Sequence, residues 1–260
     1  MMEVTVNQQN LEFFLLILVR ISAFVMVSPF FGQNNTPVRV KLGFSIFLSY
    51  IVFLLVPLSE ATPEYNTVIG YATLIVKESI VGLLIGFSAY ICTTILQFTG
   101  KIIDMEIGLS MAQIFDPVTN TQVGLTGQIY TYLVFFLMIV SNMHIFLLNT
   151  IVDSFELIEI GGIRLGDSLF KTVVGFLTTY FVVGFRIVLP VFSSILVMNC
   201  VLGIMAKVAP QMNMFSVGMQ IKVLTGLIVM FATVSLLPSV ANFIFSQMQQ
   251  MVTGVIEGMV

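Results

Sequence analysis

Charged side chains lie inside long apolar runs of this sequence, namely Arg20, Lys77, Glu78 and Arg186. A charge in lipid costs roughly 2.5–3.5 kcal/mol on insertion scales, so each must face protein, water or the membrane interface. Lys77 and Glu78 lie early in their run, and we expect both to reach the interface. Arg20 and Arg186 lie midway along theirs. We therefore predict that these two arginines are buried charges that pair with an acid or line a passage.

One combination of residues could support hydrolysis. His144 is the only histidine, and Ser110 follows Gly108 and Leu109 in a pattern that superficially resembles a nucleophile turn. An intramembrane hydrolase that needs Ser110 and His144 is thus one alternative, although nothing supplies an oxyanion hole. No phosphate loop, dinucleotide turn or metal-ligand cluster occurs in the sequence. We therefore predict no catalytic, cofactor or metal site, and a helix-packing role for His144.

Small residues recur at intervals of four in three places: Gly82 with Gly86, Gly254 with Gly258, and Gly100 with Asp104 and Gly108. Residues four apart share a helix face, so each set predicts a groove in which a second helix approaches closely. In the third set the groove carries a carboxylate. The second helix can belong to this chain or to another subunit, and the sequence leaves both open.

The segment 110–122, SMAQIFDPVTNTQ, follows the third glycine set and contains a helix breaker, Asp116-Pro117. Met111, Ile114 and Phe115 are apolar side chains in this otherwise polar connection. A solvated loop would rarely expose three such side chains together. The segment is either a loop docked on its own protein or a hydrophobic stopper inserted into a pore.

The segment 203–218, GIMAKVAPQMNMFSVG, separates two long apolar runs. Its distinctive residues are Lys207, Pro210, Gln211, Met212 and Asn213. Lipid does not accept an open backbone turn with a cation and carboxamides, so the segment lies at the membrane surface, lines a wet cavity or is buried against protein. A solute transporter with a helix broken at Pro210 is an alternative. Such transporters show paired broken helices in two halves, and no matching set of prolines occurs earlier here.

The composition of the sequence predicts which kind of secondary structure positions these residues. The 260 residues are 58% hydrophobic and only 9% charged, and the mean hydropathy is +1.06. So few charges cannot cover a soluble globule, because such domains have about 25% charged residues. We predict an all-α membrane protein with about six long apolar helices, each near the ~20 residues of a membrane span. The six runs cover approximately residues 11–31, 42–58, 68–99, 125–152, 169–201 and 217–251.

Three stretches, in this order, carry a resemblance to a known family. They are RISAFVMVSPFFG at 20–32, GKIIDMEIGLSMAQIFDP at 100–117 and LPVFSSILVMNCVLGIMAKVAPQMNMFSVGMQIKVLTGL at 189–227. Together they resemble the FliR family, whose members are export-gate subunits of flagellar type III secretion and are homologous to the SctT subunits of injectisomes. The third stretch is the most distinctive, because it includes the A-K-x-x-P-Q-M-N core of the family.

The resemblance implies a single domain over residues 1–260 and a non-enzymatic, pore-forming role without cofactors. Family members assemble with FliP and FliQ into a helical complex of tilted hairpins at the bacterial inner membrane, in the flagellar basal body. FlhB and FlhA lie around and below this gate, and unfolded flagellar proteins pass through it. In the family the loop corresponding to residues 108–122 plugs the closed channel. We expect Ser110, Met111, Ile114, Phe115, Asp116 and Pro117 to form this plug. The resemblance also implies that the segment with Lys207, Pro210, Gln211, Met212 and Asn213 is a turn between two packed helices, in contact with partner subunits or the passage. An injectisome gate subunit is the alternative assignment.

Overall fold

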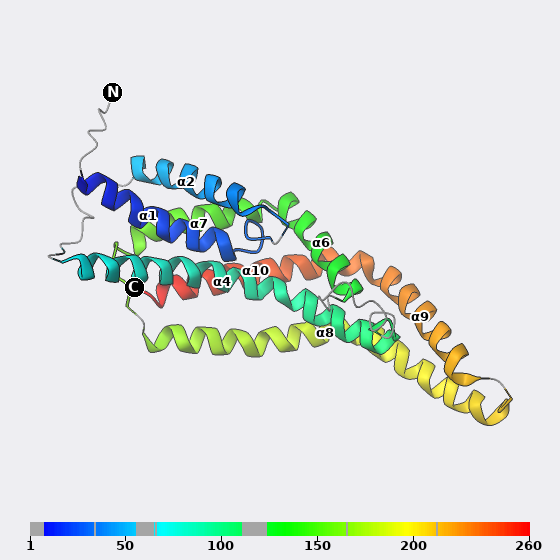
Figure 1. The fold of residues 1–260 in the computed structure, drawn as a ribbon. Helices are drawn as coiled ribbons and strands as arrows, with labels where there is room; N and C mark the ends of the chain where they lie inside the picture. Colours follow the sequence, from blue (N-terminus) through cyan, green and yellow to red (C-terminus); the bar gives the residue numbers. More distant parts are fainter. Residues whose placement is uncertain are drawn as a thin grey trace. The chain divides into compact units, whose positions relative to one another are not determined.

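The chain is helical throughout, without strands, over the residues that the structure describes. The structure is a computed structural model. It describes residues 8–33, 35–55, 65, 67–110, 124–164, 166–211 and 213–260. The helices in chain order are α1 (Gln8–Val27), α2 (Val38–Leu55), α4 (Val68–Ile107), α6 (Leu125–Val140), α7 (Met143–Leu157), α8 (Asp167–Val208), α9 (Met214–Thr233), the 3-10 helix η1 (Val234–Leu236) and α10 (Leu237–Glu257) (Figure 1).

These helices confirm the prediction of an all-α membrane protein. In the described part of the chain, five helices are long and apolar enough to cross a membrane, and six if the interrupted pair α6 and α7 counts as one span. Helices suit such a composition because each satisfies its backbone hydrogen bonds within its own segment.

Two of the six predicted runs differ from a single α-helix. The fourth, predicted over residues 125–152, breaks between α6 and α7, where Asn142 adopts a left-handed conformation with φ of 56°. Asparagine tolerates this conformation better than most residues. The sixth run comprises α9, η1 and α10, which follow one another without a gap and count as one candidate span over Phe215–Glu257. Pro238 is the second residue of α10, and proline is tolerated in the first turn of a helix.

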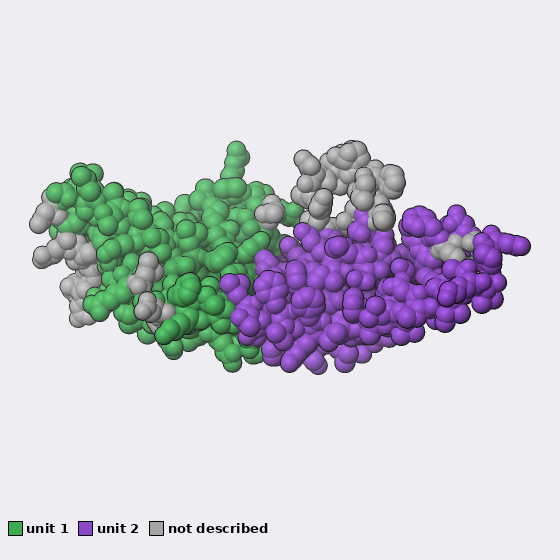
Figure 2. All heavy atoms as spheres, turned by 90° about the horizontal axis from the view of Figure 1, so that it is seen from below, with its two compact units in different colours: residues 1–92, 142–176, 246–260 green, residues 93–141, 177–245 purple. Residues whose placement is uncertain are grey.

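The chain forms two compact units (Figure 2). Unit 1 comprises Met1–Cys92, Asn142–Phe176 and Ser246–Val260, and unit 2 comprises Thr93–Ser141 and Leu177–Phe245. The single domain expected over the whole chain stays a prediction.

In unit 1, α4 and α1 approach each other through two glycines of α4. A Cβ atom at Gly86 would lie 2.9 Å from the carbonyl oxygen of Phe24, and one at Gly82 would overlap the backbone of Arg20. Gly254 and Gly258 similarly face the beginning of α8 in this unit, next to Thr172 and Leu169. For both GxxxG pairs, the approaching helix therefore belongs to this chain.

In unit 2, α4 and α6 cross at two glycines. A Cβ atom at Gly100 would overlap the backbone of Gly127, and one at Gly127 would lie 3.1 Å from the Cα of Gln97. Further along α4, Ile107 packs against Gly226 of α9. The two glycines bring the backbones of α4 and α6 together without intervening side chains, as small-residue interfaces do in membranes, while Gly226 instead makes room for the Ile107 side chain.

We expect Gly100→Ala to lower the unfolding midpoint of the detergent-purified protein, because the added methyl meets backbone atoms. Overpacking of this kind costs about 1–3 kcal/mol. Gly203→Ala is the matched control, since nothing lies within 4 Å of a Cβ at that position in α8. It should leave the midpoint unchanged or raise it slightly. Equal midpoints for both variants would contradict the close crossing of α4 and α6.

Candidate functional site: charged side chains within the apolar helices

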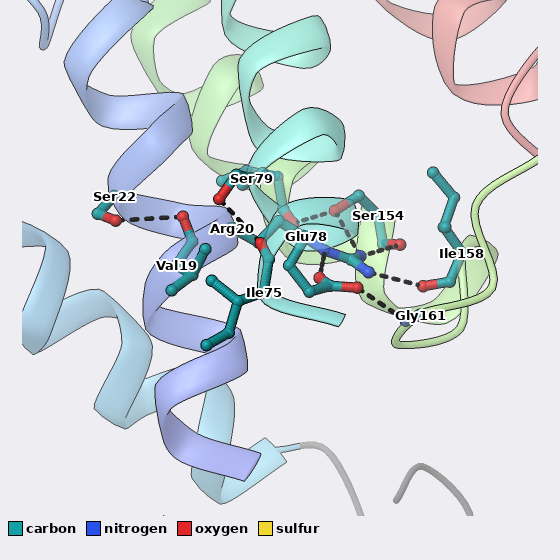
Figure 3. A network of polar contacts seen from close by, with 10 residues as sticks. Val19, Arg20, Ser22, Ile75, Glu78, Ser79, Ser154, Ile158 and Gly161 are labelled. Atoms are coloured by element: carbon teal, nitrogen blue, oxygen red, sulfur yellow. Dashed lines mark hydrogen bonds and ion pairs between the residues drawn. The ribbon is translucent and has the colours of Figure 1, made fainter. Parts of the chain in front are cut away.

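Arg20 lies in the middle of α1 and is completely buried within unit 1. Its Nε forms an ion pair with Oε2 of Glu78 on α4, at 2.5 Å (Figure 3). Its Nη1 donates to the carbonyl oxygen of Ser154, at 2.9 Å, and its Nη2 donates to that of Ile158, at 3.1 Å. The guanidinium also lies 4.2 Å from the ring centre of Phe155. The acid that the sequence left unnamed for Arg20 is therefore Glu78.

The two carbonyls that accept from Arg20 lie at the C-terminal end of α7. The carbonyl of Ser154 also accepts from the N–H of Ile158, at 3.0 Å, whereas the carbonyl of Ile158 lies beyond the last turn. The carbonyls at this end carry the negative end of the helix dipole. A guanidinium placed there donates hydrogen bonds and complements the dipole. Glu78 supplies the countercharge that a cation removed from solvent requires. Arg20 thus joins three helices, α1, α4 and α7, within one unit.

Lys77 and Glu78 together bind Gly161, in the connection between α7 and α8. Lys77 Nζ donates to the carbonyl oxygen of Gly161 at 2.9 Å, and the N–H of Gly161 donates to Oε1 of Glu78 at 2.8 Å. Gly161 has φ of 78°, which glycine adopts without steric cost. The expectation that Glu78 reaches the membrane interface is wrong, because its side chain is only 1% exposed and its partners lie within the chain.

This cluster has no open position for a ligand. Glu78 uses one carboxylate oxygen for Arg20 and the other for Gly161. Both charged side chains are closed to solvent, and their contacts hold α1, α4 and α7 together. A signal in the sequence could have identified the pair. Glu78 is the only acid in the predicted run 68–99, and Arg20 is the only cation in the run 11–31.

Asp104 on α4 caps α6 in unit 2. Its two carboxylate oxygens each accept from the backbone N–H of Thr126, at 3.3 Å, and one also accepts from the Thr126 hydroxyl. The N-cap residue of α6 is Gly124, which has no side chain to offer. The first N–H groups of a helix need an acceptor, so a carboxylate from another helix takes that role. The negative charge also complements the positive end of the α6 dipole.

Gly124 leaves room for this cap, because a Cβ atom at that position would lie 2.5 Å from Oδ2 of Asp104. Gly108, by contrast, does not line a groove as its spacing suggested. It has φ of 93° just beyond the end of α4, and its N–H donates to the carbonyl oxygen of Asp104 at 3.1 Å. The spacing of Gly100, Asp104 and Gly108 thus combines close approach, capping and helix termination.

Of the predicted plug residues, the structure describes only Ser110, which is half-buried just beyond the end of α4. Met111, Ile114, Phe115, Asp116 and Pro117 lie outside the described residues. Their role stays a prediction.

The segment 203–218 contains the turn between α8 and α9. Its exposed residues include Lys207, Pro210, Gln211 and Asn213. Asn213 is the N-cap of α9, and its side chain accepts from the N–H of Ser216 at 3.4 Å. Met212 lies outside the described residues. Whether these residues contact a passage stays a prediction.

Arg186 and His144 differ from Arg20 in their surroundings. Arg186 was predicted to be buried, yet its side chain is exposed on the isolated chain. Other sides of α8 are covered here, since Val183 and Val188 are buried, but no described element covers the side that carries Arg186. His144 lies in unit 1, with its ring centre 5.6 Å from that of Phe30. Its Nδ1 is buried without a hydrogen-bond partner in the described structure. His144 therefore packs on an aromatic ring, while Arg186 has no counterpart to Glu78 nearby.

Breaking the pair of Arg20 and Glu78 from one side should strongly destabilise the protein. Arg20→Met leaves the Glu78 carboxylate buried without its cation, which costs about 3–5 kcal/mol. In a thermal unfolding series, the double variant Arg20→Met/Glu78→Gln should lose less than the sum of the two single variants. Arg39→Gln, at an exposed arginine near the beginning of α2, is the control and should unfold like the wild type. Strict additivity would argue against a coupled pair.

Removing the cap of α6 should have a smaller effect. Asp104→Ala should cost about 0.5–2 kcal/mol, as the loss of an N-cap does, and Asp104→Asn should cost less because it keeps one acceptor oxygen. Glu106→Ala, two residues further along α4, has no capping role and should be near neutral. Unfolding midpoints of the three purified variants provide the measurement. Equal losses at positions 104 and 106 would rule out the cap.

Comparison with known proteins places the chain in a family. The model of the family described as "Bacterial export proteins, family 1" matches residues 11–248. The "Flagellar biosynthetic protein FliR" of Bacillus subtilis (strain 168) is 34% identical over 237 residues, which cover 90% of this chain and 90% of that relative. The protein of the same name from Escherichia coli (strain K12) is 25% identical over 239 residues, or 92% and 90%. Since both matches extend over nearly the whole chain, it belongs to the FliR family of bacterial export proteins.

Proposed function

We propose that this chain is a non-enzymatic, pore-forming subunit of a flagellar type III export gate in the bacterial inner membrane. Unfolded flagellar proteins would pass through this gate during flagellum assembly. The observation that carries the proposal is the match to flagellar biosynthetic proteins over 90% of both chains. The long apolar helices support it, because they suit a membrane-embedded component of an export apparatus.

The partners in this proposal are the FliP and FliQ subunits, with FlhB and FlhA as further components. The isolated chain exposes large aromatic side chains, including Phe136 (65%), Phe215 (73%) and Phe231 (82%). Such surface needs lipid or another protein to cover it. A hetero-oligomeric gate would bury part of it between subunits.

The closed state of the gate, in this proposal, depends on the residues from Ser110 to Pro117 acting as a plug. The sequence supports this through Met111, Ile114 and Phe115, whose apolar side chains could seal a passage without recognising any particular substrate. The described ends support it as well. Gly108 terminates α4, and Asp104 of α4 binds Thr126 of α6, so both flanks are held within one unit.

The test is complementation of a strain that lacks this gene. We expect loss of secreted flagellar proteins and of motility, both restored by the wild-type gene. Two variants test the plug: Ile114→Asp/Phe115→Asp and a deletion of residues 114–117. Both should increase ion leakage into resting cells, because a charged or missing plug cannot form an apolar seal. The conservative variant Ile114→Val/Phe115→Leu is the control and should not leak.

Each outcome of this test decides one part of the proposal. Unchanged leakage in the deletion would reject the plug. Normal export without the gene would reject the gate function. If the strain without the gene stays motile but loses injectisome secretion, the chain belongs to an injectisome gate instead.

A further inference from the structure

The C-terminal third of the chain has an unusual charge distribution. Between Asp167 and Glu257 the sequence contains cations but no acidic residue. The cations are Lys171, Arg186, Lys207 and Lys222. The residues 177–245 of unit 2 therefore offer no carboxylate that could neutralise Arg186. The described acids of unit 2 are Asp104 and Glu106, both on α4. Asp104 binds Thr126, and neither acid forms an ion pair with Arg186. This differs from unit 1, where Glu78 neutralises Arg20.

Arg186 presents unsatisfied polar groups at the middle of α8. Its side chain is exposed and makes no hydrogen bond or ion pair with any residue that the structure describes. Pro190 lies four residues further along the helix and has no N–H, so the carbonyl of Arg186 also lacks its usual helical donor. Lys207 differs, because it lies in the last turn of α8, where a cation complements the helix end.

Apolar side chains surround Arg186 on the exposed surface of α8. Val182 (48%) and Leu189 (54%) lie four residues before and three residues after it, on the same face, and Val197 (66%) lies further along that face. Phe185 (54%) is the preceding residue, and part of its ring packs on Phe98 of this chain. An arginine surrounded in this way cannot be solvated by lipid tails. Its neighbours cannot be left in water without cost either.

Lipid alone cannot cover this helix. The part of α8 in unit 2 runs from Leu177 to Val208, or about 48 Å at 1.5 Å per residue. The hydrocarbon core of a bilayer is about 30 Å thick. To fit entirely within it, this part of α8 would need a tilt of about 50°, beyond the range of about 0–40° that transmembrane helices show. If Arg186 instead lies at headgroup level, an apolar part of the helix remains outside the lipid and needs a protein to cover it.

We propose that the surface of α8 around Arg186 docks on an apolar helix of another subunit, and that this helix presents a carboxylate to the guanidinium. This inference rests on the proposed function, which makes the chain one component of a membrane complex. A carboxylate matches the charge and the fork of N–H donors of Arg186. The apolar neighbours of Arg186 would pack against the remainder of the same helix.

The experiment uses the full chain in the complementation strain. Arg186→Glu and Arg186→Gln should each reduce secreted flagellar protein by at least about tenfold, because the partner acid loses its cation. Arg186→Lys keeps the charge and should lie between these variants and the wild type. Arg39→Glu, at an exposed arginine near the beginning of α2, is the control and should export normally. Membrane abundance of each tagged variant separates failure to fold from failure to assemble.

The partner acid is then found by charge exchange. In the Arg186→Glu background, each Asp or Glu in the apolar helices of the subunits that copurify with the wild type is changed to Lys, one at a time. Recovery of export by one such change supports the proposal. Three outcomes would overturn it. They are that no change restores export, that only a change at an acid of this chain restores it, and that Arg186→Glu exports normally.

Lipid provides a further arm of the test. If depletion of anionic lipid reproduces the Arg186→Glu defect in wild-type cells, a headgroup phosphate is the partner and the proposal is wrong. The proposed function fails separately, through normal export in the strain without the gene. A defect in that strain with normal export by Arg186→Glu would reject only this inference.

Discussion

A guanidinium shielded from water in an apolar protein needs both a countercharge and acceptors for its N–H groups, and this requirement organises unit 1. Arg20 meets it with Glu78 from α4 and with the last carbonyls of α7. The close contact of Gly82 with the backbone of Arg20 brings α4 near enough to α1 for the ion pair to form. Since Glu78 also binds Gly161, the same carboxylate fixes the connection that leads to α8.

In unit 2 a charge of the opposite sign stabilises the opposite end of a helix. Asp104 lies at the N-terminal end of α6, as Arg20 lies at the C-terminal end of α7. In each unit, one charged side chain from a neighbouring helix therefore satisfies a helix end and complements its dipole. Both charges are buried, so their helices cannot separate without leaving an uncompensated charge in an apolar environment.

The residues that need partners are visible in the sequence, but the partners themselves are not. The place of Arg20 in an apolar run predicts that it faces an acid or a passage, whereas the place of Glu78 early in its run predicts, wrongly, that it reaches the membrane interface. The four-residue spacing of Gly100, Asp104 and Gly108 is visible as well, but it does not separate their roles. Close approach, capping and termination depend on the crossing with α6 and on the positive φ of Gly108, and spacing along one helix contains neither.

The sequence by itself determined that this chain is an all-α membrane protein of the FliR family, because hydropathy and long motifs are local properties of the chain. Only the tertiary structure decided which charges are neutralised within it. Arg20 and Glu78 are 58 residues apart, and their meeting depends on how α1 and α4 pack. Arg186 has the same chemistry and a similar place in an apolar run, yet it stays exposed on this chain. An arginine in an apolar helix must be neutralised, but whether its own fold supplies the acid depends on three-dimensional packing.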